Sequence, residues 1–519
     1  MLTGNGKENP MKLKRILACV LIPALLAPLL LSCGESSENA DPTSVSPAQG
    51  TAEPSAQGDS GGSAGEPEED PNAALYADLP AGNFDGRTFT ILAPRHTEYD
   101  FFGEVDGDII SEAVYKRNLA VETALGISFT PVFEPGLWDD RDGYCGKVKN
   151  SVMAADDAYQ LVSGYGAYIT SIAADGVFAN WNSVNGVNFE KPWWNGDIVY
   201  EMNVADHLFY VTGDLTMTSV EYLFSIFFNK LLMEDTGFES PYTLVREGKW
   251  TLDALKTYSA TLSIDFNGDG KMTIDDMYGY STDATNMVSG YMAAFDADVT
   301  VKDPETGLPV LAISEESFID KFLSIQAFLC EDPSVFLSTD EGSYVGDDRE
   351  SAKIFSEGRA LFVADILGNS AAMRDVDFDF GIIPYPKYDE AQQDYHTTAW
   401  DAYNLFSVPR TAELDFVGIV TENMAARSFE EVLPAFYDKA LLSKYARDED
   451  SAEMISLIRS SATYNFGVVN SPHIGSPGHI WRDLVGSKSN NIASKTGKNA
   501  KAMVKSLEKF LDKTYLGGE

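Results

Sequence analysis

The sequence is poor in the residues that carry most metal and nucleophilic chemistry. Its 519 residues include only 4 cysteines and 5 histidines, and no Cys-x-x-Cys pair occurs. The histidines do not have the spacing of metal ligands; they are His96, His207, His396, His473 and His479. These absences argue against a zinc ribbon and against a thioredoxin-type redox site.

Catalytic signatures are missing as well. The chain contains no His-Glu-x-x-His, no Gly-x-Ser-x-Gly and no phosphate-binding loop. A pair of carboxylates for glycoside hydrolysis could be present among 79 acidic residues, but no spacing singles one out. We therefore expect a binding protein and not an enzyme, with a glycan-active hydrolase as the alternative.

Positive charge is scarce. Lys and Arg number 38 against 79 Asp and Glu, which gives a net charge of −41. Such a chain is repelled by nucleic-acid phosphates and by anionic lipid headgroups. We expect no nucleic-acid partner, and we expect any membrane contact to be made through an anchor.

One long hydrophobic run is present, and it lies near the N-terminus. Lys12, Lys14 and Arg15 precede the apolar segment 16–31, and the small residue Ser32 precedes Cys33. This order of charge, apolar core and small residue is typical of a secretory signal. A membrane-spanning helix is the less favoured reading, because about 20 apolar residues are needed to span and two prolines interrupt this run.

The end of this run, Leu30-Leu31-Ser32-Cys33, resembles the lipobox of bacterial lipoproteins. The resemblance implies that Cys33 becomes the lipidated (palmitate-bearing) first residue of the mature chain, at the extracytoplasmic face of the bacterial cell membrane. Of the other cysteines, Cys19 would leave with the signal. The sequence leaves open whether Cys145 and Cys330 form a disulfide or stay free.

Residues 34–80 are rich in Ser, Gly, Ala, Pro and Glu and contain no Lys or Arg. Low hydrophobicity with charge of one sign predicts a disordered linker. Beyond it the chain is long enough for two or more lobes.

Strands and helices alternate from residue 85 onward. Strands are predicted at 88–93, 127–133 and 159–163, with helices at 111–125, capped by Ser111, and near 144–155. This order favours βαβ units and a mainly parallel sheet. Further predictions are strands at 208–211, 378–382 and 405–408, helices capped by Thr251 and Ser314, a largely helical stretch at 413–460 and a closing helix from Ser494.

Residues 265–276 match a calcium-binding loop. Oxygen donors are needed at positions 1, 3, 5, 7 and 12, with glycine at position 6. The predicted ligands of a structural Ca²⁺ are Asp265, Asn267, Asp269, the Lys271 carbonyl and Asp276, with Gly270 at the turn. Asp276 stands where Glu is usual, as in dockerin loops, and the alternative is a metal-free Asx/Gly turn.

Aromatic residues stand beside polar ones at two places. Trp193 and Trp194 precede Asn195, and the segment 400–403 reads Trp-Asp-Ala-Tyr; Asp214 follows a Thr-Gly pair. Aromatic faces with adjacent carboxylates and amides suit sugars in a concave site. The competing interpretation is that the tryptophans pack in the core.

With these residues laid out, the chain resembles extracellular solute-binding proteins of family 1, the lipoprotein receptors of ABC sugar importers, over roughly residues 85–515. The resemblance rests on segments 113–118 (AVYKRN), 228–230 (FNK), 241–242 (PY), 248–253 (GKWTLD), 355–362 (FSEGRALF) and 380–387 (FGIIPYPK).

This resemblance implies a two-lobed α/β fold of the periplasmic-binding-protein type (type II), with a hinge and a ligand cleft between the lobes. It divides the chain into a signal peptide (1–32), the lipidated Cys33 with an acidic linker (33–84), the first part of lobe 1 (85–210), lobe 2 (211–398), and a return to lobe 1 with C-terminal helices (399–519). The ligand-binding residues predicted from the residues and the resemblance together are Tyr165, Trp193, Trp194, Asp214, Asp365, Trp400, Asp401 and Tyr403.

The resemblance also implies the partners: a sugar ligand, which we expect to be an oligosaccharide, and ABC permease subunits, with the receptor acting as a monomer. A receptor of the same fold for a peptide or another solute remains an alternative, because fold alone does not fix the ligand.

Overall fold

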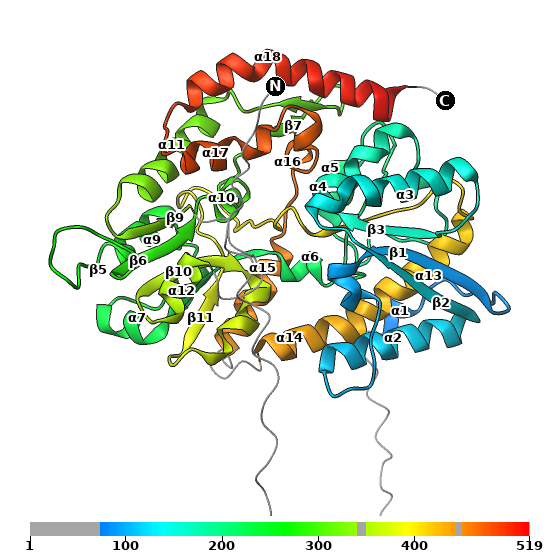
Figure 1. The fold of residues 1–519 in the computed structure, drawn as a ribbon, viewed down its shortest axis with the longest axis horizontal. Helices are drawn as coiled ribbons and strands as arrows, with labels where there is room; N and C mark the ends of the chain where they lie inside the picture. The colour runs from blue at the N-terminus through cyan, green and yellow to red at the C-terminus, as the bar shows by residue number, and fades with distance from the viewer. Residues whose placement is uncertain (1–72, 340–348, 442–448, 518–519) are drawn as a thin grey trace, which may run out of the picture. The chain divides into compact units, whose positions relative to one another are not determined.

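A computed structural model describes residues 73–339, 349–441 and 449–517. The predicted signal segment, the lipidation site Cys33 and most of the predicted linker lie outside the described residues. The described residues form two mixed sheets with helices packed against them, and each sheet is the centre of one lobe (Figure 1).

The first lobe has the sheet order β12-β3-β1-β2. Its strands are β1 (Arg87–Pro94), β2 (Ile127–Glu134), β3 (Leu161–Tyr165) and β12 (Asn404–Ser407). Strand β1 pairs in parallel with β2 and β3, with α2 (Ile109–Leu125) and α3 (Arg141–Ala154) as the connecting helices. The predicted βαβ units are confirmed. The sheet is not all parallel, because β12 returns from the other lobe and pairs antiparallel with β3.

The second lobe has the sheet order β11-β4-β10-β6-β5, with β9 paired to β6. The strands are β4 (Phe224–Asn229), β5 (Ser263–Ile264), β6 (Met277–Asp283), β9 (Val335–Ser338), β10 (Ala360–Ile366) and β11 (Phe380–Ile383). Strand β6 runs parallel to β9 and β10, whereas β4 is antiparallel to β10 and β11. Both sheets are therefore mixed, and the α/β class holds for each lobe.

Strands β7 (Thr300–Lys302) and β8 (Pro309–Leu311) form a separate two-stranded antiparallel sheet. Besides 3-10 and π-helical turns, several other helices are short: α1 (Ala73–Tyr76), α4 (Gly166–Ile169), α5 (Gly196–Met202), α6 (Thr218–Glu221), α7 (Lys230–Thr236), α8 (Pro241–Arg246), α10 (Met287–Ala294), α12 (Glu350–Ser356) and α16 (Phe466–Val469). The strand predicted at 208–211 is wrong: Val211 makes only an isolated bridge to Phe406.

Two of the three predicted helix caps differ from the structure. Asp108 caps α2, because its Oδ1 accepts the backbone N–H groups of Ile110 at 3.0 Å and Ser111 at 3.1 Å. The helix α11 (Glu316–Glu331) begins after Glu315 without a side-chain cap, so Ser314 is not its cap. Thr251 does cap α9 (Leu252–Ser259), by accepting from the Ala254 N–H.

Three segments cross between the lobes side by side and form the hinge. The Trp400 N–H donates to the Tyr222 carbonyl at 2.8 Å, and the Phe224 N–H donates to the Thr398 carbonyl at 3.1 Å. On the other side of this segment, the Thr463 N–H donates to the Thr397 carbonyl at 2.8 Å. The hinge is thus a small hydrogen-bonded unit with segment 397–400 in its middle.

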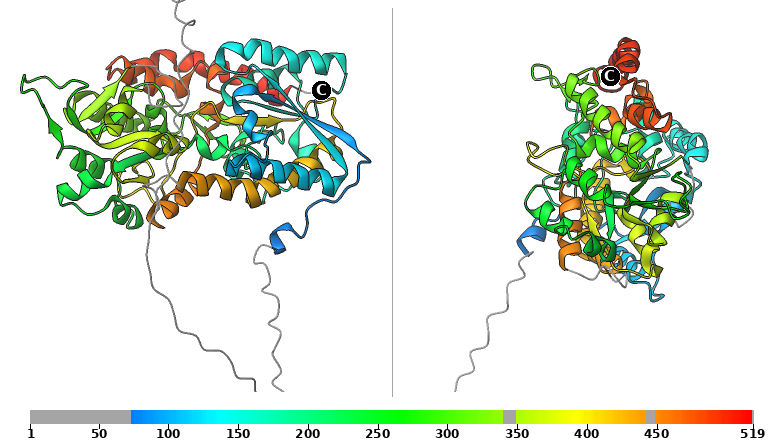
Figure 2. Two further views of the ribbon diagram at one scale, coloured as in Figure 1. Left: turned by 60° about the horizontal axis from the view of Figure 1, so that its bottom comes forward. Right: turned by 90° about the vertical axis from the view of Figure 1, so that its left-hand side faces the viewer.

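The C-terminal helices serve both lobes. Helices α13 (Leu414–Arg427) and α14 (Leu433–Leu441) pack on α2, whereas α15 (Glu449–Ser460) packs on β11. Helices α17 (Ile480–Gly486) and α18 (Ile492–Leu511) pack on α11, and α18 runs along one edge of the body (Figures 1 and 2). The helical stretch predicted at 413–460 is confirmed for 414–441 and 449–460, while residues 442–448 lie outside the described residues, and the closing helix is confirmed.

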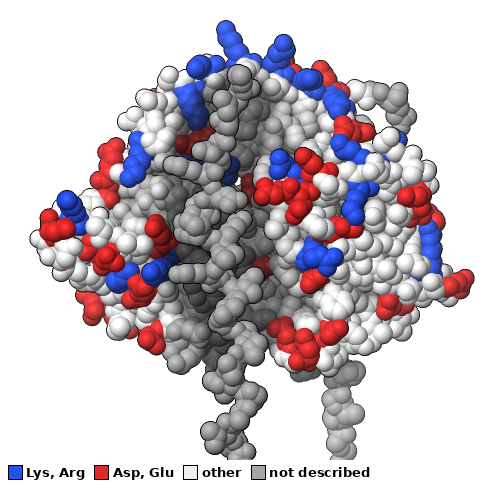
Figure 3. Space-filling model, in the orientation of Figure 1, with Lys and Arg blue, Asp and Glu red and all other residues white. Residues whose placement is uncertain are grey.

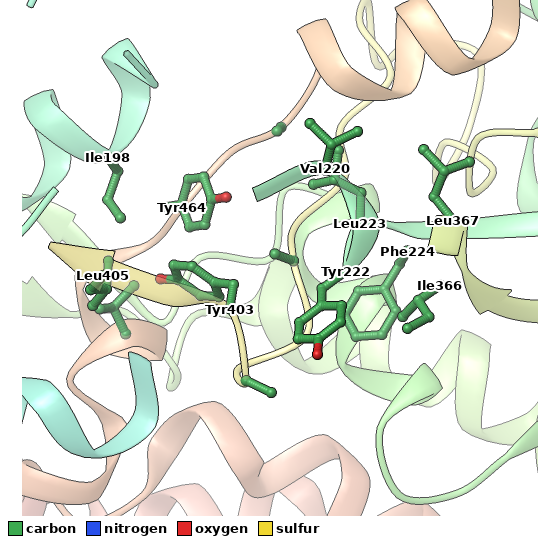
Figure 4. Close-up of a cluster of buried hydrophobic side chains, with 14 of the residues drawn as sticks. Ile198, Val220, Tyr222, Leu223, Phe224, Ile366, Leu367, Tyr403, Leu405 and Tyr464 are labelled. Carbon is green, nitrogen blue, oxygen red and sulfur yellow. The ribbon is translucent and has the colours of Figure 1, made fainter. Parts of the chain in front are cut away.

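Buried apolar side chains continue across the hinge. Figure 4 shows Tyr222, Leu223 and Phe224 from the first crossing segment near Ile366, the last residue of β10, and Leu367, which follows it. Tyr403 and Tyr464 lie on the opposite side of this cluster, with ring centroids 5.2 Å apart. Packing of this kind fixes the crossing segments, and with them the walls of the site.

Candidate functional site

A pocket of about 620 Å³ is lined by both lobes, and we call it the cleft pocket. Its walls come from chain segments that follow strands or lie on the hinge and the C-terminal helices. The lining residues are Trp138, Tyr165, Ala167, Ala284, Thr285, Asn286, Thr339, Trp400, Asp401, Pro472, His479, Arg482, Asp483 and Gly486. Because β3, β6 and β9 all end at this pocket, it lies where open α/β sheets bind ligands.

Aromatic rings form two of its walls. The rings of Trp138 and Tyr165 have centroids 6.3 Å apart and an interplanar angle of 62°. Trp138 leaves 45% of its surface exposed, and the Arg141 guanidinium lies 4.6 Å from its ring centroid. On the hinge side, Trp400 packs against Tyr222 at 5.3 Å. These rings present faces on which an apolar surface of a ligand can stack.

Asp401 is a carboxylate that lines the pocket. The Tyr165 hydroxyl donates to its Oδ1 at 3.5 Å, and His479 Nε2 lies 3.9 Å from its Oδ2. The Asp401 side chain is 38% exposed. Burial raises the pKa of Asp401, and the Arg482 guanidinium opposes that rise.

His479 is neutral at physiological pH. Burial, and then the Arg482 charge, lower its pKa to about 4. It therefore offers the pocket an uncharged imidazole, which can donate or accept a hydrogen bond. The cleft pocket holds one carboxylate from the hinge, one from Asp483 and one fixed positive charge from Arg482.

The wall from the second lobe is shaped by a buried ion pair. Arg349 forms ion pairs with Asp365 and, at 3.8 Å, with Asp283. Asp283 Oδ1 in turn accepts the N–H groups of Thr285 at 2.9 Å and Asn286 at 2.8 Å, two residues that line the pocket. Burial raises the pKa of Asp365, while Arg349 acts to lower it.

A second pocket of about 430 Å³ lies on the other side of the first crossing segment. It is lined by Tyr99, Phe102, Asp106, Asp108, Ile110, Ser111, Met217, Glu221, Gly368, Ser370 and Phe436. The Tyr99 hydroxyl donates to Glu221 at 2.7 Å, and Gly368 lies so close that a Cβ there would be 2.2 Å from Glu221 Cγ. No sequence pattern predicts this pocket.

Three of the predicted ligand-binding residues meet in the cleft pocket: Tyr165, Trp400 and Asp401. Tyr403 lies behind them and, with Asp401, lines a small cavity of about 30 Å³. These four side chains come from the end of β3 and from the hinge, as the resemblance implied. Their role in ligand binding stays a prediction.

The other four predicted residues lie elsewhere. Trp193 and Trp194 are buried, and their indole N–H groups donate to Glu422 at 3.1 and 2.8 Å. Asp214 forms an ion pair with Arg459 at 2.7 Å, and both line a separate pocket of about 230 Å³ together with Trp194. Asp365 is fully buried beside Arg349. A ligand-binding role for these four is likewise still only predicted.

Sequence reasoning missed Trp138 and the C-terminal wall. Trp138 follows β2, so the rule that placed Tyr165 after β3 could have found it. His479 and Arg482 carry no local signal, because α17 reaches the pocket only through its packing on α10 and α11.

The predicted calcium loop lies between β5 and β6. Its carboxylates accept backbone hydrogen bonds: Asp265 from Gly268 and Gly270, both at 2.7 Å, and Asp276 from Phe266 at 3.0 Å and Thr273 at 2.7 Å. Among the described residues, no three His, Cys, Asp or Glu side chains are grouped to hold a metal. Calcium binding stays a prediction.

The two cysteines within the described residues are free thiols, Cys145 buried and Cys330 partly buried.

Among the described residues, none of the helices has the combination of length and apolar composition that crossing a bilayer demands.

No protein-family model matches the chain, and no curated protein sequence matches it. Solved structures do match. A cyclo/maltodextrin-binding protein complexed with maltotetraose gives a TM-score of 0.52 at 12% identity, over 84% of this chain and 100% of that protein. A family 1 extracellular solute-binding protein from Bifidobacterium longum subsp. infantis gives 0.51 at 14% identity, over 83% and 100%.

An ABC-transporter solute-binding protein from Thermotoga lettingae, bound with α-D-tagatose, gives a TM-score of 0.50 at 12% identity, over 81% and 100%. At these identities the likeness establishes the fold. The chain has the two-lobed α/β fold of ABC-transporter solute-binding proteins, as the resemblance in the sequence indicated.

Proposed function

We propose that this chain is the binding component of a carbohydrate importer. It holds a carbohydrate, which we expect to be an oligosaccharide, between its two lobes and delivers it unaltered to ABC permease subunits. The observation that carries the proposal is the cleft pocket, in which Trp138, Tyr165 and Trp400 stand beside Asp401 and Arg482.

The chemistry of this pocket suits a sugar. Sugar rings have apolar C–H faces that stack on aromatic rings and hydroxyl groups that pair with carboxylates, amides and guanidinium groups. The volume of about 620 Å³ lies within the range of roughly 300–1,000 Å³ typical of small-molecule sites. The matching structures bound with maltotetraose and α-D-tagatose support the same ligand class.

The hinge is consistent with a protein that captures its ligand by closing its two lobes around it. A ligand that touches Tyr165 in the first lobe and Asn286 in the second binds better when the lobes approach, and this differential affinity shifts the population toward the closed state. No covalent step is needed, and the protein acts as a monomer that hands its ligand on.

The proposal includes a location and partners. The lipobox-like segment supports a lipid on Cys33, which would hold the body at the extracytoplasmic face of the bacterial cell membrane, within reach of a permease. Palmitate labelling of the expressed chain, compared with its Cys33→Ser variant, tests the anchor, since a lipoprotein loses the label only in the variant.

Calorimetry against a glycan panel that includes maltotetraose and tagatose tests the binding function. Chromatography of each glycan after incubation with the protein then shows whether the glycan has been changed. Saturable binding of one ligand per chain with the glycan unchanged supports the proposal. Steady release of smaller products would instead identify a glycan-active hydrolase. Binding of peptides with no response to any glycan would identify a receptor for another solute.

A further inference from the structure

Helix α18 has one face buried and the opposite face charged. Its buried side chains include Met503, Leu507 and Phe510, which pack toward α11 and β8. The outward side carries lysines, and the π-helical turn η9 (Asp512–Leu516) extends it by Lys513. The helix is thus a two-faced element whose apolar side is already covered.

Four of these lysines form what we call the lysine stripe: Lys498, Lys501, Lys505 and Lys509. All four are exposed, and at 3.6 residues per turn their spacing of three, four and four residues aligns them on one side of the helix. Figure 3 shows blue side chains gathered along the edge where α18 lies. None of the four forms an ion pair with another described residue, whereas Lys495 pairs with Asp483 at 3.2 Å and Lys513 with Asp175 at 2.9 Å.

This stripe contrasts with the composition of the chain. Asp and Glu outnumber Lys and Arg by 79 to 38, yet α18 has only Glu508 as an acidic residue. Like charges four residues apart repel one another and weaken a helix, so an unpaired lysine row opposes local stability. Neutralisation of the row by an external negative surface removes this repulsion.

We propose that the lysine stripe docks the folded body onto an anionic lipid surface. Lysine carries a compact, hydrated charge without the planar fork with which arginine recognises single carboxylates or phosphates, so a row of lysines alone suits a diffuse negative surface. None of the pockets described above is lined by an α18 residue. The stripe is also straight, as one side of a single helix, and so fits a plane.

The negative charge of the whole chain does not prevent this contact. At physiological ionic strength the Debye length is about 8 Å, so the membrane responds to the nearest charges and only weakly to the rest of the body. The sequence alone led to the expectation that an acidic chain meets a membrane only through its anchor. The structure shows where that charge is locally reversed.

The test is a sedimentation assay with lipid vesicles. The protein used is the chain from residue 33 onward with the substitution Cys33→Ser, so that no lipid is attached to it. Vesicles of phosphatidylcholine with phosphatidylglycerol are compared with vesicles of phosphatidylcholine alone. The test variant is K501Q/K505Q/K509Q, and the matched control, with the same change in charge at exposed lysines elsewhere, is K116Q/K249Q/K353Q.

We expect binding to the anionic vesicles alone, a fall with added salt, and a loss of about tenfold or more in the stripe variant against little change in the control. Equal loss in both variants, or equal binding to neutral vesicles, would overturn the proposal. Tighter binding to a soluble anionic polymer such as polyphosphate than to vesicles would also overturn it, and would assign the stripe to a polymer. Glycan binding measured on the same samples stays unchanged if the two sites are independent.

Discussion

Trp400 and Tyr222 are joined twice, once through the backbone and once through their rings. The Trp400 N–H donates to the Tyr222 carbonyl at 2.8 Å, and the ring centroids lie 5.3 Å apart. The two residues belong to different crossing segments, so the pair joins two segments of the hinge, and Trp400 also lines the cleft pocket. Under the proposed function, Trp400 therefore belongs to both the ligand site and the hinge.

The Trp400→Ala variant should bind its glycan about fivefold more weakly or worse, because the removed ring face costs stacking of about 1 kcal/mol or more. The backbone bond to Tyr222 persists, so we expect the cooperative unfolding transition to remain. Calorimetry and urea unfolding measure the two effects. The control is Tyr115→Ala, which removes an exposed aromatic side chain from α2. Unchanged affinity in the Trp400 variant would remove this residue from the site.

Glu422→Ala should destabilise the chain while leaving glycan affinity within about twofold. The substitution leaves the buried indole N–H groups of Trp193 and Trp194 without their acceptor, and each unpaired group costs about 1–3 kcal/mol. Glu422→Gln, which keeps one acceptor oxygen, should lose less. Urea unfolding gives the stabilities. A large loss of affinity at unchanged stability would instead place the two tryptophans in ligand binding.

His479 should make stability depend on pH. Its pKa is about 4 in the folded chain against an ordinary 6.5, so the unfolded chain binds the extra proton first as the pH falls. Stability is therefore complete above about pH 6.5 and declines as the pH falls toward 4. His479→Gln should flatten this decline by about 2 kcal/mol between pH 7 and pH 4.5. Unfolding curves at the two pH values measure it, with His207→Gln as the control; equal slopes in all three proteins would contradict the assignment.

The calcium prediction has a direct thermal test. Replacement of Asp265 and Asp269 by Ala should lower the melting temperature in the presence of Ca²⁺ and have a much smaller effect in chelator, because a bound ion stabilises only a loop that can hold it. Scanning calorimetry in both conditions gives the comparison. If the variant shifts equally with and without chelator, the loop is a turn held by its Asx hydrogen bonds alone.

Sequence patterns predicted the helices and strands well where neighbouring residues alone decide the structure. The strands near 88–93 and 127–133 and the Thr251 cap depend on neighbouring residues, and the structure contains them. The segment 208–211 has the composition of a strand but makes only one bridge, from Val211 to Phe406 of β12. Strand pairing of this kind is decided by distant segments.

The candidate site divides in the same way. Tyr165 and the segment 400–403 could be placed because they follow a strand or lie at a crossover. Trp193 and Trp194 looked equally suitable, and only the position of Glu422, which lies more than 220 residues further along, shows that their N–H groups are already occupied. The wall from α17 depends on helix packing, which no short sequence pattern records.

The cleft pocket draws its walls from residues 138 to 486, nearly the whole length of the folded body. No fragment that ends before α17 can possess a complete site, however well its first lobe folds. Ligand binding should therefore begin only after α17 has been made and has docked. A nascent or truncated chain that lacks α17 would not bind the ligand. Ligand binding would therefore indicate that both lobes and α17 have folded together.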